Sequence, residues 1–247
     1  MLKAKWKGVL AYEIEESGKT HGLFFGIMFI VYLSILLLSG GDISGGSFSG
    51  SAEIFSFVVG IVSVRQDLRL FLQNGKGRRT VFLAQVFLAL GNALFMALAL
   101  PLLGILIQVL ASSLFPGNSG VLWGEFSFLY SGVQASLPVM IALAFLANFA
   151  VFFLGMCISL IYYRLNKLGK LLVSLGVPAL IILLAIQGVR TESLHAVLRF
   201  LLDLPSPLAV YAVICIPAAF LCAGASWLLL RRAPVTGSGA SSLSLKG

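Results

Sequence analysis

Six long apolar segments alternate with polar ones along the chain. They cover residues 22–39, 47–64, 81–110, 136–161, 171–187 and 208–230. A helix needs about 20 mostly apolar residues to cross the hydrocarbon core of a bilayer, and all the segments but the second meet this length easily. The second is marginal, because its uninterrupted apolar run extends only from Ile54 to Val64. The pattern predicts an all-α membrane protein with six transmembrane helices.

The segment before the first span is amphipathic. Its apolar residues recur at helical spacing, and lysines lie between them: Leu2, Trp6, Val9, Leu10 and Ile14, with Lys3, Lys5 and Lys7. This pattern predicts an N-terminal interfacial helix on the cytoplasmic side, with Trp6 as the anchor and Lys3 and Lys7 at the headgroups. A disordered basic leader is the alternative.

The segment between the second and third spans is also amphipathic. An apolar stripe and a basic stripe share it: Val64, Leu68, Phe71 and Leu72, and Arg65, Arg69, Gln73 and Lys76. The pair Asn74-Gly75 is a typical helix stop, and Arg78 and Arg79 open the third span. We expect a short cytoplasmic helix here whose mixed surface docks a partner. An interfacial helix without a partner is the alternative.

A third amphipathic segment, residues 191–204, precedes the sixth span. Its two faces are Leu194, Val197, Leu198, Leu201 and Leu202, and Glu192, His195, Arg199 and Asp203. The pattern predicts an outer amphipathic helix that ends before Pro205. We expect His195 to be a solvated surface residue.

The distribution of charge orients the predicted spans. Of the 17 Lys and Arg residues, only Arg190 and Arg199 fall in loops on one side. Loops rich in Lys and Arg stay cytoplasmic, so we expect both termini in the cytoplasm. The composition, 59% hydrophobic and 11% charged, excludes an ordinary soluble protein. The net charge of +8 follows from membrane topology and does not indicate a nucleic-acid partner.

Candidate chemistry within the chain is sparse. The polar residues inside the spans are amides and hydroxyls, such as Gln85, Asn92, Gln108 and Asn148, whereas ion-coupled carriers usually place ionisable groups there. A Walker A motif needs a Gly five residues before its Gly-Lys pair, and no Gly-Lys pair in the sequence has one. We find no constellation of catalytic or metal-binding residues. The sequence therefore predicts a protein that is not an enzyme and carries no cofactor of its own.

The order of these segments resembles the permease subunits of bacterial type-2 ATP-binding-cassette exporters. The stretch from Arg65 to Phe82 is similar to the coupling segment of small permeases of that class, in which a short helix ends in Asn-Gly and a basic pair leads into the next span. The resemblance assigns the contact with the ATPase to eleven residues: Arg65, Gln66, Asp67, Leu68, Arg69, Phe71, Leu72, Asn74, Gly75, Arg78 and Arg79.

The resemblance also implies a function. Residues 1–233 would form one permease domain in the bacterial cytoplasmic membrane, followed by a flexible tail, 234–247. Two such subunits, identical or homologous, would enclose an export pathway for a peptide, antibiotic or lipid, lined by spans one, two and five. Separate cytosolic ATPases would bind the ATP and Mg²⁺ and drive transport. A stand-alone carrier or channel is the alternative.

Overall fold

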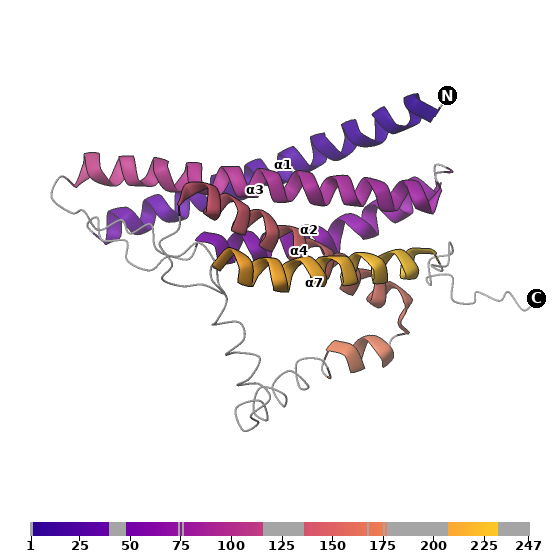
Figure 1. Ribbon diagram of the computed structural model, residues 1–247. Coiled ribbons are helices and arrows are strands. Elements are labelled where there is room, and N and C mark those ends of the chain that lie inside the picture. The colour runs from indigo at the N-terminus through magenta and orange to yellow at the C-terminus, as the bar shows by residue number, and fades with distance from the viewer. Residues whose placement is uncertain are drawn as a thin grey trace, which may run out of the picture.

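The computed structural model of the protein describes residues 2–39, 48–73, 75, 77–115, 136–166, 168–174, 176 and 207–231. These residues are almost entirely helical, and no strand occurs among them. The long helices lie roughly along one axis and form a bundle (Figure 1). They are α1 (Leu2–Leu38), α2 (Phe48–Gln73), α3 (Arg78–Leu114), α4 (Leu137–Arg164) and α7 (Pro207–Arg231). Residues 168–174 form a further short helix.

Four of the described helices are long and apolar enough to cross a membrane. The spanning stretches are Ser17–Leu38, Arg78–Leu114, Leu137–Arg164 and Ala212–Arg231. The first, third, fourth and sixth predicted spans are thus confirmed as membrane helices, and the chain is a membrane protein. The more polar α2 covers the predicted second span. The predicted fifth span and the outer amphipathic helix at 191–204 lie almost wholly outside the described residues.

The structure corrects two expectations about separate amphipathic helices. The N-terminal segment and the first span form one uninterrupted helix, α1, of 37 residues. Their junction contains no proline, and an i,i+4 salt bridge of 2.7 Å between Lys19 and Glu15 spans it. The cytoplasmic segment likewise continues α2 without a break as far as Gln73. It continues because Leu68 and Phe71 extend the apolar stripe of the second span and pack on the same core.

Contacts between helices fix their directions. Helix α1 contacts α3 at two levels. His21 bonds Asn92, and further along both helices Leu36 and Ile107 belong to one apolar cluster. The two helices therefore run parallel. By the same reasoning, α2 runs antiparallel to α3 and parallel to α4. The Arg78 guanidinium at the start of α3 donates 2.7 Å to the Arg231 carbonyl at the end of α7.

These directions bring many basic residues to one end of the bundle. That end, which we call the basic end, contains the last residues of α2, α4 and α7 and the first residues of α3. Among the described residues it carries Arg78, Arg79, Arg164, Lys170 and Arg231. The opposite end contains the end of α1 and the starts of α2, α4 and α7, and among the described residues of these helix termini Glu53 is the only Asp, Glu, Lys or Arg. This arrangement agrees with the predicted charge asymmetry.

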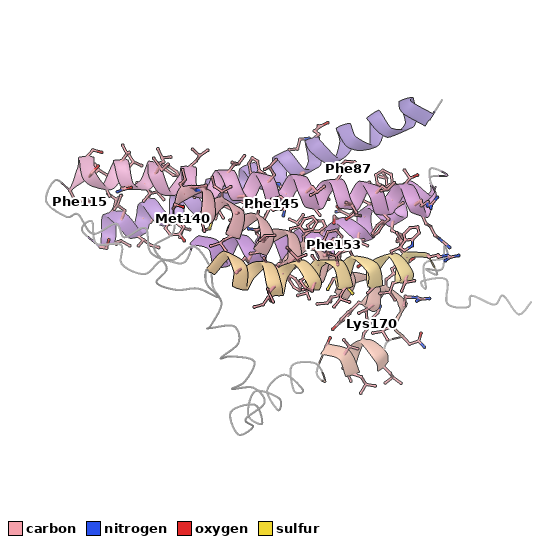
Figure 2. All side chains as sticks on the ribbon, in the orientation of Figure 1. Phe87, Phe115, Met140, Phe145, Phe153 and Lys170 are labelled. Carbon is pink, nitrogen blue, oxygen red and sulfur yellow. The ribbon has the colours of Figure 1, made fainter. Side chains whose placement is uncertain are left out.

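The main core lies between α2, α3, α4 and α7. Phe152, Phe153 and Met156 of α4 form its centre, with residues of the three other helices packed around them. Phe153 lies inside the bundle, whereas Phe87 points outward from α3 (Figure 2). Along α3, Val81, Ala84, Gln85, Ala89 and Asn92 turn toward this interior. A large apolar surface stays exposed on the other faces, as a lipid-facing surface requires.

Candidate functional site

A chain of buried hydrogen bonds links four helices near the level of Asn92. The Nε2 atom of His21 (α1) lies 2.8 Å from Oδ1 of Asn92 (α3). The Asn92 Nδ2 donates 2.9 Å to the Ser56 hydroxyl (α2), which donates 2.6 Å to Oδ1 of Asn148 (α4). All four side chains are buried. We call His21, Asn92, Ser56 and Asn148 the polar chain.

One backbone carbonyl fixes the direction of every hydrogen bond in the polar chain. The Asn148 Nδ2 donates 2.8 Å to the Ala144 carbonyl, which only accepts, so Oδ1 of Asn148 faces Ser56 and accepts. The Ser56 hydroxyl therefore donates to Asn148 and accepts from the Asn92 amide nitrogen. The Asn92 oxygen is left facing His21, and it requires a proton on Nε2. The polar chain binds helices together, because asparagine amides do not relay protons readily.

A second polar cluster lies closer to the basic end. Asp67 of α2 is buried, and Nε2 of Gln85 (α3) donates to its carboxylate. The hydroxyl of Ser63, one turn before Asp67, donates 2.9 Å to Oε1 of Gln85. The two bonds to Gln85 orient its amide, so that the nitrogen faces the carboxylate. The cluster thus binds the last turns of α2 to α3.

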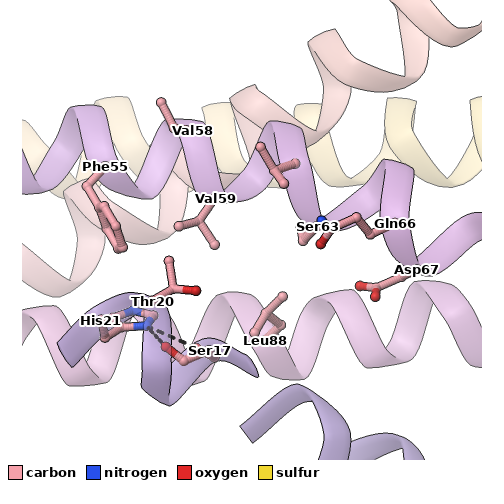
Figure 3. A pocket seen from close by; sticks show the side chains of 11 residues that line it. Ser17, Thr20, His21, Phe55, Val58, Val59, Ser63, Gln66, Asp67 and Leu88 are labelled. Atoms are coloured by element: carbon pink, nitrogen blue, oxygen red, sulfur yellow. Dashed lines mark hydrogen bonds between the residues drawn. The ribbon is translucent and has the colours of Figure 1, made fainter. Parts of the chain in front are cut away.

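A cleft separates α1 from α2 and extends from His21 to Asp67 (Figure 3). Its volume is about 190 Å³, and it is partly open to the surroundings. Ser17, Thr20 and His21 line one end, Ser63, Gln66 and Asp67 line the other, and Val58, Val59, Val62 and Leu88 form the apolar walls with Phe55. The cleft therefore offers an apolar surface between two polar ends, of which one holds an imidazole and the other a carboxylate.

The residues predicted to contact an ATPase occupy different environments. Gln66 is exposed, but Asp67, Leu68 and Phe71 are buried within the chain. The expectation that Leu68 and Phe71 offer an apolar surface to a partner is wrong for this structure, because both pack with Val64 against α3 and α4. Sequence periodicity shows that a helix has an apolar face, but it does not show which neighbour covers that face.

The turn between α2 and α3 lies at the surface of the basic end. The helix stop is confirmed, because α2 ends at Gln73 and Gly75 has a φ of 68°, the left-handed conformation common after a helix C-terminus. Gly75, Gly77 and Arg79 are exposed. The side chains of Arg65, Arg69 and Leu72, and Asn74 as a whole, lie outside the described part of the structure.

Several other predicted features cannot be compared with the structure. The backbone of Lys3, Trp6 and Lys7 lies in α1, but their side chains are outside the described part. His195 and the tail after Arg231 lie wholly outside the described part. Among the described residues, no group of three or more His, Cys, Asp or Glu side chains is arranged to hold a metal ion.

Sequence reasoning did not identify the polar chain as a unit. It noted Asn92 and Asn148 as polar residues within spans, and amides inside a membrane bundle often bond between helices. It assigned no role to His21 or to Ser56. His21 and Ser56 could have been recognised only from their positions on the inner faces of α1 and α2. Which face of each helix points inward depends on how the helices pair, which the sequence does not show.

Comparison with protein-family models, curated proteins and solved structures gives no match to this chain.

Proposed function

We propose that the chain is the membrane subunit of a type-2 ATP-binding-cassette exporter. It would span the membrane six times with both termini in the cytoplasm. Paired with a second copy or a homologous subunit, it would form an export pathway for a hydrophobic or amphipathic substrate such as a peptide, an antibiotic or a lipid. A separate cytosolic ATPase would bind ATP and Mg²⁺ and supply the energy.

The observation that carries this proposal is the construction of the α2–α3 hairpin. Its exposed turn lies at the basic end, and the helices that lead into it are bound to each other through Asp67 and Gln85. Leu68 and Phe71 bind the same part of α2 to the core. A force applied to the turn would therefore move α2 and the core together. An ATPase that drives transport from outside the membrane needs such a connection.

The helix directions support the proposed topology. Loops rich in Lys and Arg stay cytoplasmic, so the basic end would face the cytoplasm. The end of α4, Arg164, lies at the basic end and the start of α7, Pro207, lies at the opposite end. The chain between them must therefore pass from one end to the other. An additional crossing by the predicted fifth span meets this requirement and gives six spans.

A stand-alone carrier or channel is the second candidate, and one observation favours it. Ion-coupled carriers need ionisable groups inside the bundle, and the sequence predicts no charged residue in the middle of any span. The structure buries both His21 and Asp67, and both line the cleft between α1 and α2. The two candidates differ in whether the α2–α3 turn must bind an ATPase.

The test compares two charge reversals at the basic end. Arg79→Glu changes the exposed turn of the hairpin, and Arg231→Glu makes the same change at the end of α7. An anion is favourable near a helix N-terminus and unfavourable near a C-terminus, by about 0.3–1 kcal/mol. Arg79→Glu should therefore reduce folding stability no more than the control, Arg231→Glu. If only Arg79→Glu lowers the recovery of the ATPase, the cause is a lost contact with that partner.

The measurement is the recovery of an ATP-hydrolysing partner with the tagged, full-length chain from its native membranes. We expect the unmodified chain and Arg231→Glu to recover an ATPase with a Walker A motif. Arg79→Glu should reduce its recovery about tenfold, the equivalent of about 1.4 kcal/mol. Recovery of no such ATPase with the unmodified chain, or equal recovery with both variants, would overturn the proposal and favour the stand-alone carrier.

A further inference from the structure

The cleft between α1 and α2 has two chemically different ends (Figure 3). At one end the rings of His21 and Phe55 pack edge-to-face with a centroid distance of 5.3 Å, and Phe24 stacks on Phe55 at 4.2 Å. Both ring nitrogens of His21 already have partners, Asn92 and Ser17. This end, which we call the aromatic end, therefore offers a ligand mainly ring surface.

The other end of the cleft contains a carboxylate. Among the described residues that line the cleft, Asp67 is the only Asp, Glu, Lys or Arg. Its carboxylate accepts a hydrogen bond from the Gln85 side-chain amide, and a carboxylate has about four acceptor sites. Ser63 and Gln66 line the same end, and their side-chain oxygens are further acceptors. We call Ser63, Gln66 and Asp67 the acidic end.

The walls between the two ends are apolar, and α2 fixes the distance between them. Asp67 follows Phe55 by 12 residues within one continuous helix, which is a rise of about 18 Å. Three valines of α2 and Leu88 of α3 cover this length. The cleft is long for its volume of about 190 Å³, so it is narrow. A ligand that fits is slender and apolar along its body.

We propose that the cleft binds an organic cation, a slender arylalkylammonium ion whose ammonium group lies at the acidic end and whose ring lies at the aromatic end. A primary ammonium has three N–H donors, and they match the acceptors of Ser63, Gln66 and Asp67. As the exported molecule, such a cation would specify the substrate class of the proposed exporter, and that role rests on the proposed function. Binding itself requires no ATPase.

The charge of Asp67 makes the proposal selective. An anion would place like charges together at the acidic end, which is unfavourable. A neutral molecule of the same shape would fit the apolar walls but would gain nothing from the carboxylate. For probes that share one body, affinity should therefore fall in the order cation, neutral molecule, anion.

Three dansyl probes with the same aromatic group and the same pentyl chain provide this comparison. The cation is dansylcadaverine, the neutral probe is its N-acetyl derivative, and the anion is dansylaminohexanoic acid. Dansyl emission increases and shifts to shorter wavelength in apolar surroundings. Each probe is titrated into the full-length chain in nanodiscs of zwitterionic lipid, and the signal from empty nanodiscs is subtracted.

We expect saturable binding of the cation, at least about tenfold tighter than that of the neutral probe, the equivalent of about 1.4 kcal/mol. Asp67→Asn keeps an acceptor for Gln85 but removes the charge. It should lower the affinity for the cation to that for the neutral probe and leave neutral-probe binding unchanged, which also shows that the cleft is intact. The matched control is Glu53→Gln, which removes a carboxylate of α2 outside the cleft and should change neither affinity.

A second pair of variants locates the binding site. Val62 lines the cleft and is 44% exposed, so Val62→Phe narrows the cleft without disturbing the core. It should weaken the binding of both the cation and the neutral probe. Ile54→Phe enlarges another exposed residue of α2, one that does not line the cleft, and it should leave both affinities unchanged.

Three results would overturn the proposal. Equal affinities of the unmodified chain for the cation and the neutral probe would do so without any variant. Cation binding that Asp67→Asn leaves unchanged would show that the carboxylate does not hold the ammonium. Binding that Val62→Phe leaves unchanged would place the probe outside the cleft. Recovery of the ATPase tests the proposed function separately, so either proposal can fail while the other stands.

Discussion

The contact between α2 and α4 and the contact between α1 and α3 differ in how closely the backbones approach. Gly60 and Gly155 lie where α2 crosses α4, and a Cβ added to either would come within 2.3 Å of a carbonyl oxygen of the other helix. On α1, Gly18, Gly22 and Gly26 have no atom within 4 Å of an added Cβ. One pair of helices requires glycine for its packing, and the described packing of α1 does not.

This difference separates the bundle into two parts. Dispersion and backbone contact bind α2 to α4 along their length, as is common for small residues at membrane helix interfaces. In contrast, α1 is attached through side chains: the polar chain, Phe24 and Phe25 against residues of α2 and α3, and the cluster around Tyr32 and Leu36. A pushed hairpin would therefore move α2 and α4 as one unit. A glycine in a membrane helix therefore does not by itself indicate a close contact between helices.

The largest effect should come from adding a methyl group at the tight crossing. Gly60→Ala forces α2 and α4 apart because the new Cβ overlaps the Phe152 carbonyl, and we expect a loss of about 3 kcal/mol in the free energy of unfolding. The matched control is Gly26→Ala on α1, which should change stability by less than about 1 kcal/mol. Reversible unfolding in mixed detergent micelles with SDS, followed by circular dichroism, measures both. Equal effects would contradict the comparison.

A smaller effect is expected where the two parts share hydrogen bonds. Ser56→Ala removes the link between Asn92 and Asn148 and leaves buried polar atoms unpaired, at a cost of about 1–2 kcal/mol. The control is Ser34→Ala on α1, whose hydroxyl is exposed and bonds only its own helix in the described structure. Combined with His21→Phe, the Ser56→Ala cost should be less than additive, because both residues belong to one network. Strict additivity would show that the polar chain does not act as a unit.

The smallest of these effects concerns the turn of the hairpin. Gly75→Ala places a side chain at a φ of 68°, which costs about 1 kcal/mol for an L-residue. Gly77→Ala is the control, since Gly77 has a φ of −71° that alanine adopts without strain. Thermal unfolding of the two variants in the same detergent should show a lower midpoint for Gly75→Ala alone. A loss of the same size at Gly77 would mean that the turn is constrained by something other than its backbone conformation.

The positions of the helices were largely predictable, and the packing between them was not. Apolar length alone located α3, α4 and α7 to within a few residues, because a membrane helix must satisfy its own backbone hydrogen bonds. Asn74-Gly75 correctly indicated the end of α2. The burial of Leu68 and Phe71 could not be predicted, because an apolar stripe can face either a partner or its own core. His21 joins Asn92 across 71 positions of sequence, and only the parallel pairing of α1 with α3 brings them together.

The central claim is that the first half of the membrane-spanning part of α1 is held less tightly than the α2–α4 core, since 17% of the spanning window of α1 is buried, compared with 50% of that of α4. Hydrogen–deuterium exchange of the full-length chain in lipid nanodiscs tests it most directly, by comparing residues 17–24 of α1 with residues 88–95 of α3. The two segments lie at the same level of the bundle, which the bond between His21 and Asn92 establishes. Local openings set such exchange rates. We expect the α1 segment to exchange at least about tenfold faster, the equivalent of about 1.4 kcal/mol. Equal rates in the two segments, or slower exchange in α1, would contradict the account.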